Sequence, residues 1–199
     1  MASGSAPLFE GLGGHGHPIT TDVGLAQSYF DQGLVLCYAF NHAEAVRSFE
    51  AALTIDPECA MCFWGKALAL GPNINKPMAD DDVATAFEAV QQAQRFADAT
   101  TKVEQALIGA LAKRYASEPV EDRSELDRAY AEAMAEVAAS FPEDGDVQTL
   151  YAEALMDTMP WNYWTEDLAP KPETEVVLAA LESVMAAHPD HPGASHLYI

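Results

Sequence analysis

The chain has 199 residues, with 31 acidic and 10 basic side chains, and its formal net charge is −21. Binding to nucleic-acid backbones and to anionic membrane surfaces is therefore disfavoured, because few cations are present to displace counterions from phosphates. No apolar run approaches the roughly 18 residues that a membrane span requires. The opening sequence MASGSAPLFEGLGG lacks the basic and apolar regions of a signal peptide, and three cysteines are too few for a disulfide scaffold, so we expect a cytoplasmic protein.

The beginning of the chain differs in character from the rest. Residues 1–20 are rich in glycine and lack periodicity, which predicts an extended lead-in before a helical domain over residues 21–199. The first helix is expected to begin near Thr21 or Asp22, since either residue can cap a helix. It folds back on a second helix, which Pro57 ends because proline cannot continue a helix.

The remaining segments also show helical periodicity. Further helices are predicted over residues 58–70, 79–96, 100–115, 124–140, 146–158 and 173–187, with the start of a ninth after residue 192. No segment shows the alternation of a strand. The predicted class is therefore all-α, built from antiparallel helix pairs that stack as a right-handed solenoid.

Five residues of the first helix pair stand at the signature positions of a known repeat. They are Gly33, Ala45, Phe49, Ala52 and Pro57. This pattern resembles a tetratricopeptide repeat, in which small residues let two helix backbones approach closely. The resemblance implies a module that binds a protein or peptide partner on its concave face and performs no reaction.

Longer sequence segments indicate a narrower resemblance. They are HPITT (17–21), YFDQGL (29–34), YAFNHAEAVRSFEAA (38–52), CAMCFWGKALALGPNIN (59–75), DVQTLYAEALMD (146–157) and HPGASHLYI (191–199). These segments are similar to those of a bacterial family of uncharacterised tetratricopeptide-repeat proteins. Members of that family are longer and have further histidines, one of them directly after the position of Ile199. The resemblance therefore implies that this chain is the N-terminal part of a longer one, and it raises the prospect of metal binding.

An aromatic cluster is the candidate for contacts with a partner. Trp161, Tyr163 and Trp164 lie in a predicted loop, where aromatic side chains can line a binding surface. The alternative is that they pack beneath the loop. No nucleophile elbow, phosphate loop, dinucleotide fingerprint or HExxH motif is present, so the sequence does not decide whether the protein is an enzyme.

Two cysteines provide the first candidate for a metal site. Cys59 and Cys62 lie three residues apart at the start of a helix, so both thiols face one side, and the helix N-terminus lowers their pKa. Such a pair forms half of many zinc sites and is also a redox motif. The third interpretation is structural, with Cys62 in the core and Cys59 exposed.

Histidines provide the other candidate ligands. His15 and His17 flank one glycine, so in an extended chain both imidazoles point the same way and can hold one ion. His188, His191 and His196 lie in and after a predicted turn. The alternatives are a solvated tail for the first pair, and turn and cap residues for the second group. Imidazole and thiolate ligands favour zinc or copper, provided that these clusters meet in the fold. The alternative to a partner-binding module is therefore a metal-binding protein or a fragment of a metalloenzyme.

Overall fold

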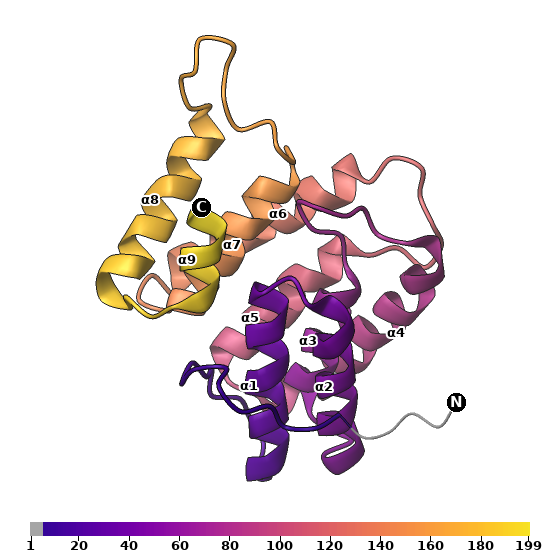
Figure 1. The fold of residues 1–199 in the computed structure, drawn as a ribbon. Coiled ribbons are helices and arrows are strands. Elements are labelled where there is room, and N and C mark those ends of the chain that lie inside the picture. The colour runs from indigo at the N-terminus through magenta and orange to yellow at the C-terminus, as the bar shows by residue number, and fades with distance from the viewer. Residues whose placement is uncertain (1–5) are drawn as a thin grey trace.

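The computed structural model describes residues 6–199, and all regular structure in this part of the chain is helical (Figure 1). The predicted all-α class is confirmed. The helices are α1 (Gly24–Tyr38), α2 (His42–Ile55), α3 (Ala60–Leu70), α4 (Asp80–Phe96), α5 (Lys102–Leu111), α6 (Ser124–Ser140), α7 (Gly145–Asp157), α8 (Pro172–Ala187) and α9 (Pro192–Tyr198). Short 3₁₀-helices, Ala97–Ala99 and Ala112–Arg114, follow α4 and α5. Within residues 6–199, no helix has the length and apolar character needed to cross a membrane.

The predicted start of α1 is wrong by two or three residues. The helix begins at Gly24, and Val23 occupies the N-cap position without a side-chain cap. Thr21 has a different partner, since its hydroxyl donates a hydrogen bond to Asp56 at the end of α2 (2.6 Å). The hydroxyl thus fastens the segment before α1 to the helix pair instead of capping α1.

The close approach expected from small residues is present in the first three helices. The Phe49 ring of α2 lies against Gly33 of α1 and Gly65 of α3. A Cβ atom at Gly33 would be 2.6 Å from Phe49 Cε1, and one at Gly65 would be 2.3 Å from the same atom. Because real Cβ atoms do not approach so closely, the packing of α1, α2 and α3 depends on glycine at both positions.

The helices pack so that the last one lies beside the first. The most extensive contacts join α1 with α2, α3 with α4, and α7 with α8. The main core includes residues of α1 to α7, and a smaller core joins α7, α8 and α9. Because α9 contacts α1 as well as α7 and α8, two segments that are far apart in sequence meet at one place (Figure 1).

The predicted lead-in runs past the contact between α1 and α9, and its described part, residues 6–20, contains no helix. Residues 1–5 lie outside the described residues. Hydrogen bonds to α1 and to Glu104 are among the contacts that hold the lead-in. Gln27 donates to the carbonyl of His17 (2.9 Å), and Asp31 accepts from the His17 backbone N–H (3.1 Å). The backbone and hydroxyl of Thr20 both donate to the buried Glu104 carboxylate, each at 2.6 Å.

Glu104 makes this anchor sensitive to acid. Burial would raise its pKa, but hydrogen bonds from Thr20 and Thr101 outweigh burial, and the pKa lies below its usual value. A depressed carboxyl pKa gives stability that is present above the unfolded-state pKa and is lost as pH falls through the folded-state pKa.

We therefore expect Glu104→Gln to lower the free energy of unfolding at pH 7 by about 1.5–3 kcal/mol, the usual contribution of hydrogen bonds to a charged group. The variant should also lose less stability than the wild type between about pH 5 and pH 3. Urea denaturation across this range measures both effects. Exposed Glu88→Gln is the control, and an unchanged acid dependence in Glu104→Gln would contradict the assignment.

Candidate metal centre

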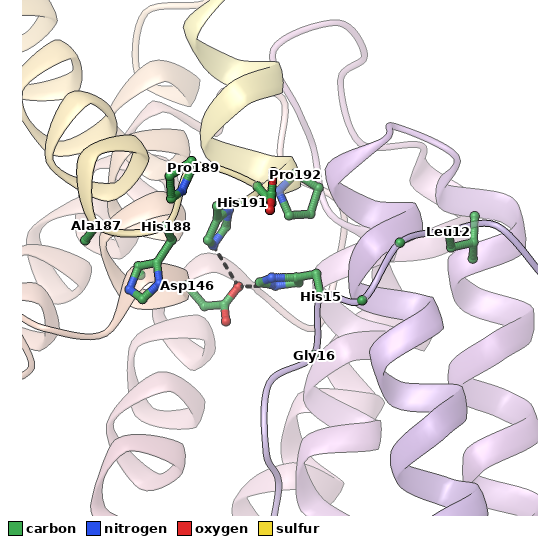
Figure 2. Close-up of a pocket in the computed structure, with 13 residues that line it drawn as sticks. Leu12, His15, Gly16, Asp146, Ala187, His188, Pro189, His191 and Pro192 are labelled. Atoms are coloured by element: carbon green, nitrogen blue, oxygen red, sulfur yellow. Dashed lines mark hydrogen bonds and ion pairs between the residues drawn. The ribbon is translucent and has the colours of Figure 1, made fainter.

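A buried carboxylate in the first turn of α7 is the centre of the candidate site. Asp146 is 7% exposed, and side chains from three other parts of the chain surround it. His15 Nε2 lies 2.9 Å and His191 Nε2 lies 3.2 Å from its Oδ1 atom, as Figure 2 shows. Tyr38 donates its hydroxyl to the same oxygen (2.6 Å), and His17 Nδ1 lies 3.0 Å from Oδ2. We call these five residues the Asp146 cluster.

The electrostatics of the Asp146 cluster keep the carboxylate ionised. Burial alone would raise the pKa of Asp146, but hydrogen bonds from His15, His17 and His191 hold that pKa far below its usual range. Burial lowers the pKa of His17, yet the hydrogen bond and negative charge of Asp146 outweigh it and raise the pKa. A carboxylate that is ionised before binding is ready to act as a metal ligand.

Within residues 6–199, two sets of donor atoms are close enough to hold ions. One ligand atom each from His15, His191 and Asp146 lies within 4.8 Å of the others, and the same is true of His17, Asp144 and Asp146. Zinc binds nitrogen and oxygen at about 2.0–2.2 Å, so donors on opposite sides of an ion are about 4 Å apart. The distances between donor atoms in both sets agree with this separation.

The first set opens onto a cavity of about 780 Å³ (Figure 2). Residues 12–16, the start of α7 and the turn 187–192 line it. Gly145 lets this turn approach α7, because a Cβ at that position would lie 3.1 Å from His188 Cδ2 and 3.4 Å from His191 Cδ2. The ligand atoms of the first set are thus close to a space that can admit a small molecule.

The other predicted histidine ligands have different places. His188 is exposed and lines the cavity, but it belongs to neither donor set. The ring of His196 lies beside Phe40, and its Nδ1 is hydrogen-bonded to the carbonyl of Tyr38. His191 has a second role, since its Nδ1 accepts a hydrogen bond from the Ala194 backbone (3.1 Å) and caps α9.

The cysteine pair is not brought to this site. Cys59 and Cys62 form a disulfide with each other and are 2% and 0% exposed. The expectation that Cys59 is exposed is therefore wrong, because the pair packs into the main core. Neither sulfur offers a thiolate in this state, and neither cysteine belongs to a donor set.

Sequence patterns did not point to the acidic members of the site. Asp144 caps α7 by accepting from the Val147 backbone (3.1 Å), and Asp146 follows two residues later. Acidic residues are common at the start of any helix, because they interact favourably with its dipole. The Asp-Gly-Asp sequence is the one available signal, and it becomes informative only beside the histidines.

The aromatic residues lie in the loop between α7 and α8, which projects from the helices at the top of Figure 1. Trp161 is 70% exposed and Trp164 is 51% exposed. Tyr163 is partly buried and packs against the smaller core. The loop thus exposes two of the three residues predicted to contact a partner.

We expect Asp146→Asn to lower the free energy of unfolding by about 3–5 kcal/mol, because loss of one partner leaves buried charged or polar groups uncompensated. Hydrogen exchange should increase most at residues 12–20 and in α9, which the Asp146 cluster ties to α7. Asp190→Asn, an exposed change beside the same cavity, should stay within about 0.5 kcal/mol of the wild type. Equal stability of the two variants would show that the cluster does not hold these segments together.

In comparisons with known proteins, no family model, no curated protein and no solved structure matches this chain. The resemblance to tetratricopeptide repeats therefore stays a prediction.

Proposed function

We propose that this chain binds a divalent transition-metal ion, with zinc as the best fit, through His15, Asp146 and His191. The observation that supports this proposal is the meeting of two imidazoles and an ionised carboxylate with donor atoms within 4.8 Å. His15 and Asp146 are 131 residues apart in sequence, so the fold itself assembles this set.

The donor types favour zinc over copper(I). Two imidazoles and one carboxylate are a common zinc set, and three protein ligands leave one position open for water or another small ligand. Copper(I) prefers sulfur ligands, and Cys59 and Cys62 are bonded to each other outside the cluster. Tyr38 and His17 donate to Asp146 and would orient its carboxylate toward the ion.

Metal binding at His191 competes with a proton. Because Nδ1 of His191 accepts the hydrogen bond from Ala194, the neutral ring has its proton on Nε2, which faces Asp146. For Nε2 to bind an ion as a neutral ligand, that proton must move to Nδ1, and the hydrogen bond from Ala194 is then lost. The affinity should also fall as pH falls, because a protonated imidazole cannot bind an ion.

The first test is calorimetric titration of the metal-free chain with Zn²⁺ at pH 7. His15→Gln is the most informative variant, because the hydrogen bond between its ring and Asp146 joins the lead-in to α7. We expect its zinc affinity to fall by more than about tenfold, because the variant removes a direct ligand and the loss of an outer-shell partner alone typically costs about 10–100-fold. His42→Gln, outside the cluster, should bind as the wild type does. Absence of retained zinc in the wild type, or equal affinity of the two variants, would overturn the proposal.

Partner binding on a stacked helical scaffold is the second candidate, and the exposure of Trp161 and Trp164 favours it. Glu166 and Asp167 lie in the same loop, so the expected partner has an apolar pocket with a basic rim. Partner binding is tested by measuring the affinity of basic, apolar peptides for the wild type and for the double variant Trp161→Ala/Trp164→Ala. Since both side chains are largely exposed, the variant should keep the wild-type stability. Equal peptide affinity would exclude the loop as the binding surface.

A further inference from the structure

The two carboxylate oxygens of Asp146 face different donors. Oδ1 faces His15 and His191, whereas Oδ2 lies 3.0 Å from His17 Nδ1. Asp144 completes the second set, in which all donor atoms lie within 4.8 Å of one another. One carboxylate therefore belongs to two separate sets of ligands, one at each of its oxygens.

His17 supplies an independent observation at the second set. Its side chain is 6% exposed, and its Nε2 atom is buried without a hydrogen-bond partner among the described residues. The ring nitrogen that faces the carboxylates is Nδ1, which lies 3.0 Å from Asp146 Oδ2, so the second set contains a buried imidazole directed at a buried carboxylate.

Asp144 has the capacity to serve as a ligand without losing its role in the helix. Its Oδ1 atom accepts the capping hydrogen bond from Val147. Its other oxygen has no hydrogen bond within residues 6–199 and remains available to an ion.

We propose that Asp146 bridges two divalent ions, the first held by His15 and His191 and the second by His17 and Asp144. The first ion is that of the proposed function, so this inference rests on it. Carboxylate-bridged ions in two-metal sites are typically about 3.5–4 Å apart. The second set contains one nitrogen donor and two carboxylates, a harder combination that suits Mn²⁺ as well as Zn²⁺.

The charges of the ligands agree with this arrangement. Asp144 and Asp146 contribute negative charge, and the imidazoles would bind as neutral ligands. The chain as a whole has a net charge of −21, so its field attracts cations to the site.

The experiment loads the metal-free full chain with Zn²⁺ alone and, separately, with Mn²⁺ alone. Metal analysis gives the number of ions per chain, and electron paramagnetic resonance of the Mn²⁺ form shows whether the ions are coupled. We expect two ions per chain and an exchange-coupled spectrum. Asp144→Asn should retain one ion and give the spectrum of an isolated Mn²⁺.

The variants separate loss of a ligand from loss of the fold. Asparagine caps a helix about as well as aspartate, so Asp144→Asn keeps the start of α7. Circular dichroism checks this directly. Asp190→Asn removes an exposed carboxylate beside the cavity and should still hold two ions. His17→Gln should match Asp144→Asn in metal content.

Each result has one meaning. A wild type with one ion overturns the second site and leaves the proposed function standing. Two ions in Asp144→Asn, with an unchanged coupled spectrum, overturn the bridging arrangement. No bound ion in the wild type overturns both proposals.

Discussion

The buried charge of Asp146 is the constraint on which the arrangement of this protein depends. Removing a carboxylate from water costs several kcal/mol, and the cost is offset only when donors surround it. Here the donors come from the lead-in, α1 and the turn before α9, and Asp146 itself starts α7. The same interactions therefore position helices that are distant in sequence and assemble the candidate site.

The other end of α7 also contains a buried carboxylate, which is paired with an arginine instead of histidines. Asp157 pairs with Arg114, whose guanidinium also donates to the carbonyl of Pro72 (3.0 Å) and lies over the ring of Tyr130. Burial raises the pKa of Glu153 and raises that of Asp157 to about 8, while Arg114 opposes both effects. Asp127 also interacts electrostatically with Arg114, so this buried guanidinium faces acids from both α6 and α7. The inward face of α7 is thus polar at both ends.

Much of the fold was predictable because local signals end each helix. Pro57 and the Phe141–Pro142 pair mark helix ends that the structure confirms, and α6 has the predicted bounds. The start of α1 was predicted two or three residues too early, and Thr21, one of the expected caps, is instead hydrogen-bonded to Asp56 at the end of α2. Such a contact leaves no trace in local periodicity.

The site was predictable only in part, for a related reason. The spacing of His15 and His17 indicated that both imidazoles face one way, and both do reach Asp146. Which histidines of the last segment join them is decided by the packing of α9 against α1, and only His191 does. Asp146 itself was missed, because its partners are set by long-range packing.

The meeting of α9 with the lead-in has a consequence for biosynthesis. A ribosome that has made residues 1–190 has supplied His15, His17 and Asp146 but not yet His191, so the first donor set is incomplete until nearly all of this sequence has emerged. Closure then joins segments at opposite ends of the sequence, and contacts of such separation form slowly. An ion that needs all three donors could therefore bind only after His191 has left the ribosome, long after His15 and Asp146 have done so.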